Sequence, residues 1–87
     1  MNCEYVYGIC YSNDDDVLRS SHWPSSFYRI PLVGESVKST EFSSKTIVAK
    51  VVNVTHCWGT LPNGDRGPYV EIELVAVEDW LTMNGRL

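Results

Sequence analysis

Two segments in the second half of the chain carry the strongest signal for β-structure. Residues 46–58 are dense in valine, isoleucine and threonine, the β-branched residues that pack well on a pleated sheet. Residues 69–77 form the clearest strand of the sequence, with Glu71 and Glu73 on the side that faces water. The turn-forming pair Asn63-Gly64 lies between the segments, in a loop longer than two residues. We therefore predict a hairpin with a wide, exposed tip. The inward residues of its second strand are Val70, Ile72, Leu74 and Ala76.

The first strand of this hairpin changes its buried face part of the way along. Before the change, the apolar positions are Ile47, Ala49 and Val51; after it, the opposite parity carries Val52, Val54, His56 and Trp58. A β-bulge is the ordinary cause of such a shift, since one extra residue moves every later side chain to the other face. We expect a bulge near Val51 and Val52 that bends the strand, as in strands that close small barrels.

The first half of the chain has weaker signals. Residues 2–12 alternate aromatic and smaller side chains as a half-buried strand does, and Gly8 within them indicates a bulge or a close backbone approach. A short helix could follow the acidic run that begins at Asp14. With 87 residues there is room for one domain, residues 1–87. The predicted fold is mainly β: a small antiparallel curled sheet or barrel of about four to six strands with at most one short helix.

Charge and cysteine content restrict the environment and the partners. Eleven acidic and seven basic residues give a formal charge of −4, so the chain lacks the basic stripe that binds nucleic acid nonspecifically. Three cysteines do not make a disulfide framework, and neither a signal peptide nor a membrane-spanning segment is visible. We expect a cytoplasmic protein with reduced thiols and no membrane association.

Catalytic and metal-binding patterns are missing from the sequence. It has no Cys-x-x-Cys pair, and the adjacent His56 and Cys57 should point to opposite faces of a strand. The run Asp14-Asp15-Asp16 lacks the alternation and the distant glutamate of a calcium loop, and favours a helix cap or a partner-facing acidic patch. We therefore predict no catalytic residue, metal or cofactor.

Aromatic and charged residues in loops are the candidate binding residues. Tyrosine and tryptophan dominate protein-interface hot spots, and Trp23 and Trp58 each lie at a loop edge beside Pro or Gly. The three surfaces we single out are the acidic run, the loop of residues 20–28 and the hairpin tip. Their candidate binding residues are Asp14, Asp15, Asp16, Trp23, Tyr28, Trp58, Asp65 and Arg66.

Residues 27–77 resemble a group of small β-barrel proteins of bacteriophages and mobile elements. The shared features are a Pro-x-x-Gly-Glu-x-Val entry at residues 31–37, a Val-x-x-Val-x-His strand at residues 51–56, and the closing strand at residues 70–74. The resemblance implies a compact barrel or curled sheet and an accessory role, for which anti-CRISPR proteins are one example. It carries no catalytic residues across.

The function expected from these observations is that of a non-enzymatic protein-binding module. It would be a phage or mobile-element accessory or inhibitory protein that acts on a host protein or complex, with a homodimer as a further option. Two alternatives stay open. One is a small barrel that binds single-stranded nucleic acid or a nucleotide, which requires Arg29, Lys50 and Arg66 to converge. The other is a metal- or thiol-dependent enzyme.

Overall fold

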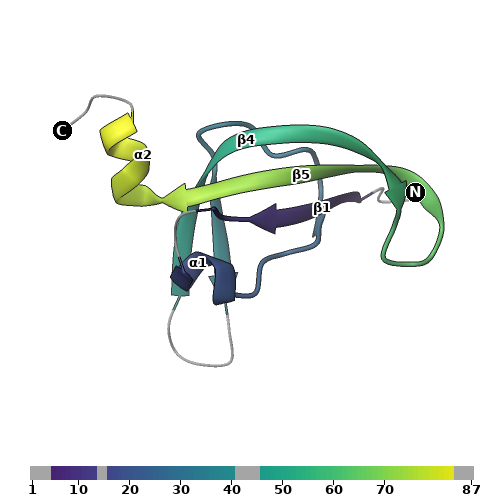
Figure 1. Ribbon diagram of the computed structural model, residues 1–87, viewed down its shortest axis with the longest axis horizontal. Helices are drawn as coiled ribbons and strands as arrows, with labels where there is room; N and C mark the ends of the chain where they lie inside the picture. Colours follow the sequence, from purple (N-terminus) through teal and green to yellow (C-terminus); the bar gives the residue numbers. More distant parts are fainter. Residues whose placement is uncertain (1–4, 14–15, 41–45, 84–87) are drawn as a thin grey trace.

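The hairpin expected in the second half of the chain consists of the two longest strands of the computed structural model (Figure 1). The structure describes residues 5–13, 16–40 and 46–83. The hairpin strands β4 (Thr46–Thr60) and β5 (Arg66–Ala76) pair antiparallel from Ala49 and Ala76 to Thr60 and Arg66. The other elements are β1 (Val6–Tyr11), α1 (Asp16–Ser20), β2 (Ser26–Phe27), β3 (Ser36–Thr40) and α2 (Val77–Met83).

The hairpin tip is a three-residue loop that starts at Pro62. The N–H of Gly64 donates to the carbonyl of Leu61 at 2.9 Å, and the N–H of Leu61 donates to the carbonyl of Asp65 at 2.7 Å. Gly64 has a φ of 91°, the left-handed conformation that follows the type I turn in hairpins of this length. The proline and the Asn-Gly pair therefore account for the geometry of the tip, and its residues are exposed as predicted.

A β-bulge divides β4 into two parts. The register shifts between Val51, which is opposite Leu74, and Asn53, which is opposite Glu73. The bulge predicted near Val51 and Val52 is thus confirmed. On one side of it β4 pairs with β3 through Thr46–Lys50, and on the other it continues with β5 as an arm that extends from the body of the protein (Figure 1).

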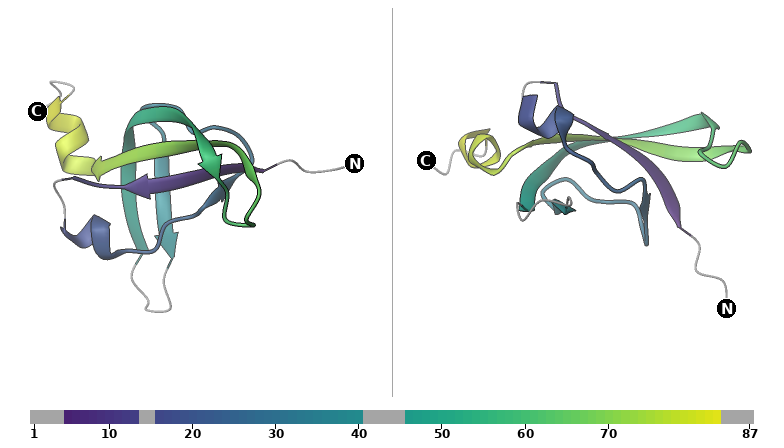
Figure 2. Two further views of the ribbon diagram at one scale, coloured as in Figure 1. Left: turned by 45° about the vertical axis from the view of Figure 1, so that its right-hand side comes forward. Right: turned by 90° about the horizontal axis from the view of Figure 1, so that it is seen from below.

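The five strands form one curled sheet in the order β2-β1-β5-β4-β3, which confirms the mainly β fold class. Figure 2 shows the curl, with the chain between α1 and β3 running across its open side. Trp23, Phe27 and Ile30 of this crossing segment pack against the core. The buried core residues are Leu18, Val37, Ala49, Val51, Val70, Ile72 and Leu74.

One strand pair differs from the antiparallel sheet that the sequence predicts. β1 lies parallel to β5, with Gly8 opposite Val70 and Tyr11 opposite Glu73. Parallel neighbours need a long crossover, and here the crossover comprises α1, β2, β3 and β4. The alternation within one strand indicates which side chains are buried but not which strand lies beside it. The parallel pairing of β1 with β5 therefore could not be predicted from this pattern.

The structure also has two short helices where the sequence predicts at most one. Each helix has acidic residues in its first turn, where carboxylates stabilise the unpaired N–H groups. In α1, Asp16 forms an ion pair with Arg19, and Leu18 contributes to the core. In α2, the hydroxyl of Thr82 donates to the carbonyl of Glu78 at 3.1 Å.

Gly8 lies where the side chains of Phe27 and Ile72 pack closely against the backbone of β1. A Cβ atom at this position would be 2.8 Å from Cε2 of Phe27 and 2.9 Å from Cδ1 of Ile72. Distances this short require the core to shift. Gly8 therefore marks a close approach, one of the two roles expected from the sequence.

We predict that Gly8→Ala lowers the free energy of unfolding by about 1–3 kcal/mol, because the added methyl group overpacks the core. Urea denaturation measures this change. Gly59→Ala is the matched control, since its Cβ would meet only the half-exposed ring of Tyr69, at 3.2 Å, and this ring can move. An equal effect of the two substitutions would contradict the argument.

Candidate functional site

The arm of β4 and β5 carries an exposed tryptophan, Trp58, on the face that continues from the core. Directly opposite residues share a face, so Val54 lies beside Ile72, and His56 beside Val70. We call the face that bears these side chains the inner face. Ile72 and Val70 are buried, but one step further toward the tip Trp58 is 66% exposed. The inner face thus begins as core and ends as open surface.

A hollow of about 460 Å³ lies at the point where the core ends, and we call it the arm hollow. Two tyrosines form its wall on the side away from the arm: Tyr5 is 52% exposed and Tyr28 is 82% exposed. Their rings lie 5.4 Å apart at an angle of 38° and so support one another. The arm hollow is lined by Tyr5, Val6, Tyr28, Ile30, His56, Cys57, Pro68, Tyr69 and Val70.

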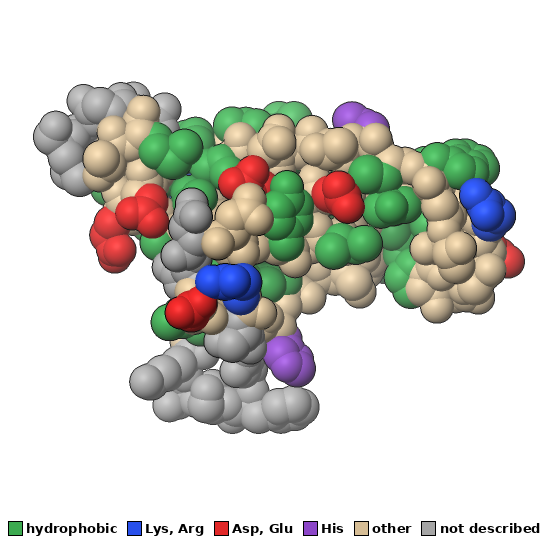
Figure 3. Space-filling model, in the orientation of Figure 1, with side chains coloured by type: hydrophobic (Ala, Val, Ile, Leu, Met, Phe, Trp, Pro, Cys, Tyr) green, Lys and Arg blue, Asp and Glu red, His purple; other side chains and the backbone are tan. Residues whose placement is uncertain are grey.

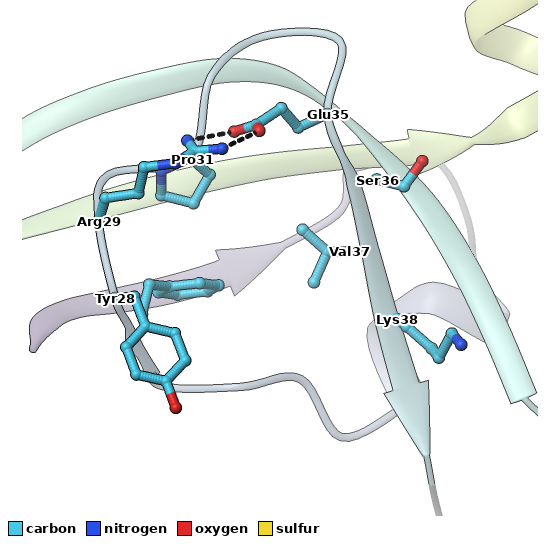
Figure 4. A pocket seen from close by; sticks show the side chains of 8 residues that line it. Tyr28, Arg29, Pro31, Glu35, Ser36, Val37 and Lys38 are labelled. Carbon is cyan, nitrogen blue, oxygen red and sulfur yellow. Dashed lines mark hydrogen bonds and ion pairs between the residues drawn. The ribbon is translucent and has the colours of Figure 1, made fainter.

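A second hollow, of about 330 Å³, lies on the other side of Tyr28 (Figure 4). Tyr28 and Val37 lie on opposite sides of it, and the ion pair between Arg29 and Glu35 lies on its rim. Because Tyr28 lines both hollows, it is the exposed side chain on which the two surfaces meet.

Glu35 holds together the turn that borders the second hollow. Arg29 donates to both of its carboxylate oxygens, at 2.8 Å from Nη1 to Oε1, and the N–H of Leu32 donates to Oε1 at 2.6 Å. Hydrogen bonding from Arg29, supported by that of Leu32, lowers the pKa of Glu35 to about 2. The carboxylate is therefore ionised at all physiological pH values.

The same turn is fastened to the bulge of β4. Gly34 donates to the carbonyl of Val51 at 2.8 Å, and the N–H of Val51 donates to the carbonyl of Glu35 at 2.9 Å. Gly34 has a φ of 95°, as the third residue of a type II turn requires, and Nζ of Lys50 donates to its carbonyl at 3.2 Å. The Gly-Glu pair noted in the sequence thus has a structural role.

The outer face of β1 and β5 is a different kind of surface. Pairing places Ile9 beside Glu71 and Tyr11 beside Glu73, so acidic side chains lie among apolar ones on the face seen in Figure 3. Burial raises the pKa of the Tyr11 phenol, and the charges of Glu73 and Glu71 raise it further. The carboxylates interrupt this face, whereas the inner face of the arm runs through Val54, His56 and Trp58 and meets a charged side chain at the tip, where Arg66 lies opposite Thr60.

The predicted site residues fall into three groups. Tyr28 and Trp58 are exposed on or beside the arm hollow, and Asp65 and Arg66 lie beyond them at the tip. Asp16 is in α1, at the other end of the molecule from the tip (Figure 1). Asp14 and Asp15 lie outside the described residues.

Trp23 belongs to the body of the protein rather than to an open surface. Its indole N–H donates to the carbonyl of Leu18 at 2.7 Å, and its ring packs against the core. This contact ties α1 to the crossing segment. The position of Trp23 at a loop edge beside Pro24 suggested an exposed side chain, but the ring packs inward instead.

Tyr5 and His56 are surface residues that the sequence analysis did not select. Tyr5 looked like part of a half-buried strand, but it lies one residue before β1 and turns toward Tyr28. The proximity of two loop-edge tyrosines depends on how β1 and β2 pair, through Val6 and Phe27. No local pattern in the sequence reports that pairing.

The histidine and cysteine side chains of the described residues give little support for a metal site or for reactivity at Cys10. Among residues 5–13, 16–40 and 46–83, no three His, Cys, Asp or Glu side chains form a group that could hold a metal ion. Cys10 faces the core, its thiol donates to the carbonyl of Pro24 at 3.7 Å, and burial raises its pKa to about 11. It is therefore a protonated packing group at neutral pH.

Comparisons with known proteins give no relative for this chain. It matches no protein-family model, no curated protein and no solved structure. The helices within the described part of the chain are too short and too polar to cross a membrane.

We predict that Glu35→Gln destabilises the protein at neutral pH and that the difference from wild type disappears in acid. The folded pKa of about 2 lies below the unfolded value of 4.5, so the stabilisation is present above pH 4.5 and is lost as the pH falls toward 2. Urea unfolding of both proteins across this range measures the difference. A difference that does not change with pH would contradict an electrostatic role.

We also predict that iodoacetamide alkylates Cys10 about tenfold or more slowly in the folded protein than in urea at neutral pH, because the thiolate is the reactive species. The rate in the folded protein should rise only as the pH approaches 11. Mass spectrometry of the peptide that contains Cys10 measures the rate. Rapid labelling at neutral pH would show that the thiol is not held in the core.

Proposed function

We propose that this chain is a non-enzymatic protein-binding module whose partner binds at the arm hollow. The partner would place an apolar side chain in the hollow, between Tyr28 on one side and Trp58 on the arm. This proposal keeps two of the surfaces expected from the sequence, the loop at Tyr28 and the hairpin, and gives them a common centre.

The observation that carries the proposal is the exposure of three large aromatic side chains. Tyr5 and Tyr28 line the arm hollow, and Trp58 lies on the inner face of the arm opposite Pro68, which also lines it. Tyr5, Tyr28 and Trp58 are 52%, 82% and 66% exposed. Exposed aromatic side chains beside a hollow are what hot spots of protein interfaces consist of, because tyrosine and tryptophan supply a large contact area for few rotatable bonds. A core that needed these rings for packing would bury them.

The chemistry of the partner follows from the charge of the chain. The net charge is −4, and two cations of the turn next to Tyr28 are engaged: Arg29 with Glu35 and Lys50 with the carbonyl of Gly34. A protein surface with a protruding apolar residue and a positive surrounding field fits such a module best.

The biological role that we propose is that of an accessory or inhibitory protein of a bacteriophage or mobile element, acting on a host protein complex in the cytoplasm. The support for the role is the resemblance of residues 27–77 to such proteins, and anti-CRISPR proteins illustrate it. The support for the compartment is the odd number of cysteines, of which Cys10 and Cys57 are free thiols.

Single-stranded nucleic acid is the less well supported partner. It requires Arg29, Lys50 and Arg66 to converge, but the first two bind the Gly34–Glu35 turn and Arg66 starts β5 at the tip. An oligonucleotide titration followed by fluorescence anisotropy at low salt tests this alternative directly, and a flat curve would remove it.

We predict that Trp58→Ala and Tyr28→Ala each weaken the complex with the partner protein by about 30-fold, the effect of a hot-spot residue worth about 2 kcal/mol. Partners are first captured from bacterial lysates on the tagged wild-type chain, and the affinity of the purified complex is then measured by titration calorimetry. Both side chains are exposed, so the variants should keep the thermal stability of the wild type.

Leu32→Ala and Met83→Ala are the matched controls. Their side chains are 62% and 64% exposed but lie neither in the arm hollow nor on the inner face of the arm that bears Trp58, so the affinity should stay within about twofold of wild type. Equal losses for all four variants, or a complex that none of them affects, would contradict the proposed surface.

A further inference from the structure

The outer edge of β4 is open along the whole arm. β3 pairs only with Thr46–Lys50 of β4, and the Gly34–Glu35 turn then occupies the N–H and the carbonyl of Val51. From Val52 to the tip, β4 pairs on one side only, with β5, in the part of the chain that the structure describes. In Figure 1, β4 runs along the arm beside β5, and the open edge is the side of β4 that faces away from β5.

The direction of the backbone groups along this edge follows from the tip. The N–H of Leu61 donates toward β5, to Asp65, and in an antiparallel pair the residues alternate between bonding the partner strand and pointing away from it. The N–H and carbonyl groups of the even-numbered residues therefore point outward. The bulge agrees with this assignment. Before the bulge, the N–H and carbonyl of the odd-numbered Val51 point outward. The extra residue shifts the alternation, so the even-numbered residues point outward after it. The outward residues are Val54, His56, Trp58 and Thr60.

Nothing in the side chains of this edge protects it from pairing. Monomeric proteins commonly block open edges with lysine, proline or inward charges. Residues 51–61 include no Lys, Arg, Asp, Glu or Pro, and Val54, Thr55 and Trp58 are strong strand formers. The charged residue closest to this stretch on the β3 side is Lys50, which belongs to the part that is already paired.

We propose that two copies of this chain pair antiparallel through this edge, with the two-fold axis at Cys57. In that register His56 of one copy lies opposite the partner's Trp58, and Val54 lies opposite the partner's Thr60. All four outward residues of each copy then form hydrogen-bonded pairs, and each such pair makes two bonds. The four residues are symmetrically placed about residue 57. The same segment of a second copy, running in the opposite direction, can therefore pair with every outward N–H and carbonyl group.

A second copy fits this edge better than a strand of another protein for an electrostatic reason. The net charge of −4 makes two copies repel one another, and a shared edge without charged residues is the place where this repulsion is least. On the outer edge of β3, by contrast, a two-fold axis at Lys38 would set two lysines opposite one another, which destabilises a sheet. The pairing also brings Trp58 beside the partner's His56 and joins the inner faces of the two arms.

Molar mass against concentration is the first test. Sedimentation equilibrium of the reduced protein between about 1 and 200 µM should show a rise from 9.8 kDa toward twice that mass. A constant mass of 9.8 kDa over this range would overturn the proposal.

Amide hydrogen exchange measured by NMR tests which edge is used. At the highest concentration the amides of His56 and Trp58 should be protected, and on dilution their exchange should accelerate. The amides of Thr55 and Cys57 donate toward β5 and should stay protected at both concentrations. Dimerisation with unprotected amides at His56 and Trp58 would show a different interface and would contradict the proposal.

Two lysine substitutions test the register. Cys57→Lys would place two lysines opposite one another and should weaken association by about fivefold or more, whereas Thr55→Lys would place its lysine opposite the partner's Gly59 and should have little effect. Circular dichroism confirms that both variants fold. Equal effects of the two substitutions would overturn the two-fold axis at residue 57.

A disulfide offers an independent check of the same register. Residues opposite one another in a non-hydrogen-bonded pair have Cα atoms about 4.5 Å apart, within the range of about 4.4–6.8 Å that a disulfide spans. Mild oxidation with diamide, which accepts the two electrons and two protons of the thiols, should join Cys57 to the partner's Cys57. Cys57→Ser should abolish the covalent dimer but retain the reversible one. A covalent dimer through another cysteine would contradict the register.

Discussion

The extra residue in β4 is the constraint on which the rest of this structure depends. By shifting the register between Val51 and Asn53, it bends the longest strand and lets one strand serve two purposes. The part before the bulge pairs with β3 and closes the core. The part after it leaves the body with β5 and exposes its inner face.

The bulge also determines where the loop before β3 is attached. It leaves the N–H and the carbonyl of Val51 pointing away from β5, and the Gly34–Glu35 turn binds both. The ion pair of Arg29 and Glu35 then closes the loop on itself next to Tyr28. The backbone of Val51 thus holds the turn that lies next to Tyr28, the residue between the two hollows. The position of Tyr28 therefore depends on β4 as well as on its own segment.

Much of the second half of the chain could be predicted from sequence, because its signals are local. Strict alternation identified Val70, Ile72 and Leu74 as core, the change of parity located the bulge, and Asn63-Gly64 marked the tip. The parallel pairing of β1, the burial of Trp23 and the contact of Tyr5 with Tyr28 could not be predicted in this way. Each of them depends on segments far apart in the chain, and a single sequence contains no pattern that says which segments meet.

The parallel pairing of β1 with β5 has a consequence for how the chain is made. Gly8 lies opposite Val70, 62 positions later (70 minus 8), so β1 can pair with β2 early but with β5 only after β5 has been synthesised. Contacts of such long range are slow to form, because the chain must lose entropy before the contact rewards it. Until then one edge of β1, a strand that includes Ile9 and two tyrosines, is open, as in the partly folded chains that chaperones bind. This part of the sheet can therefore close only once β5 is available.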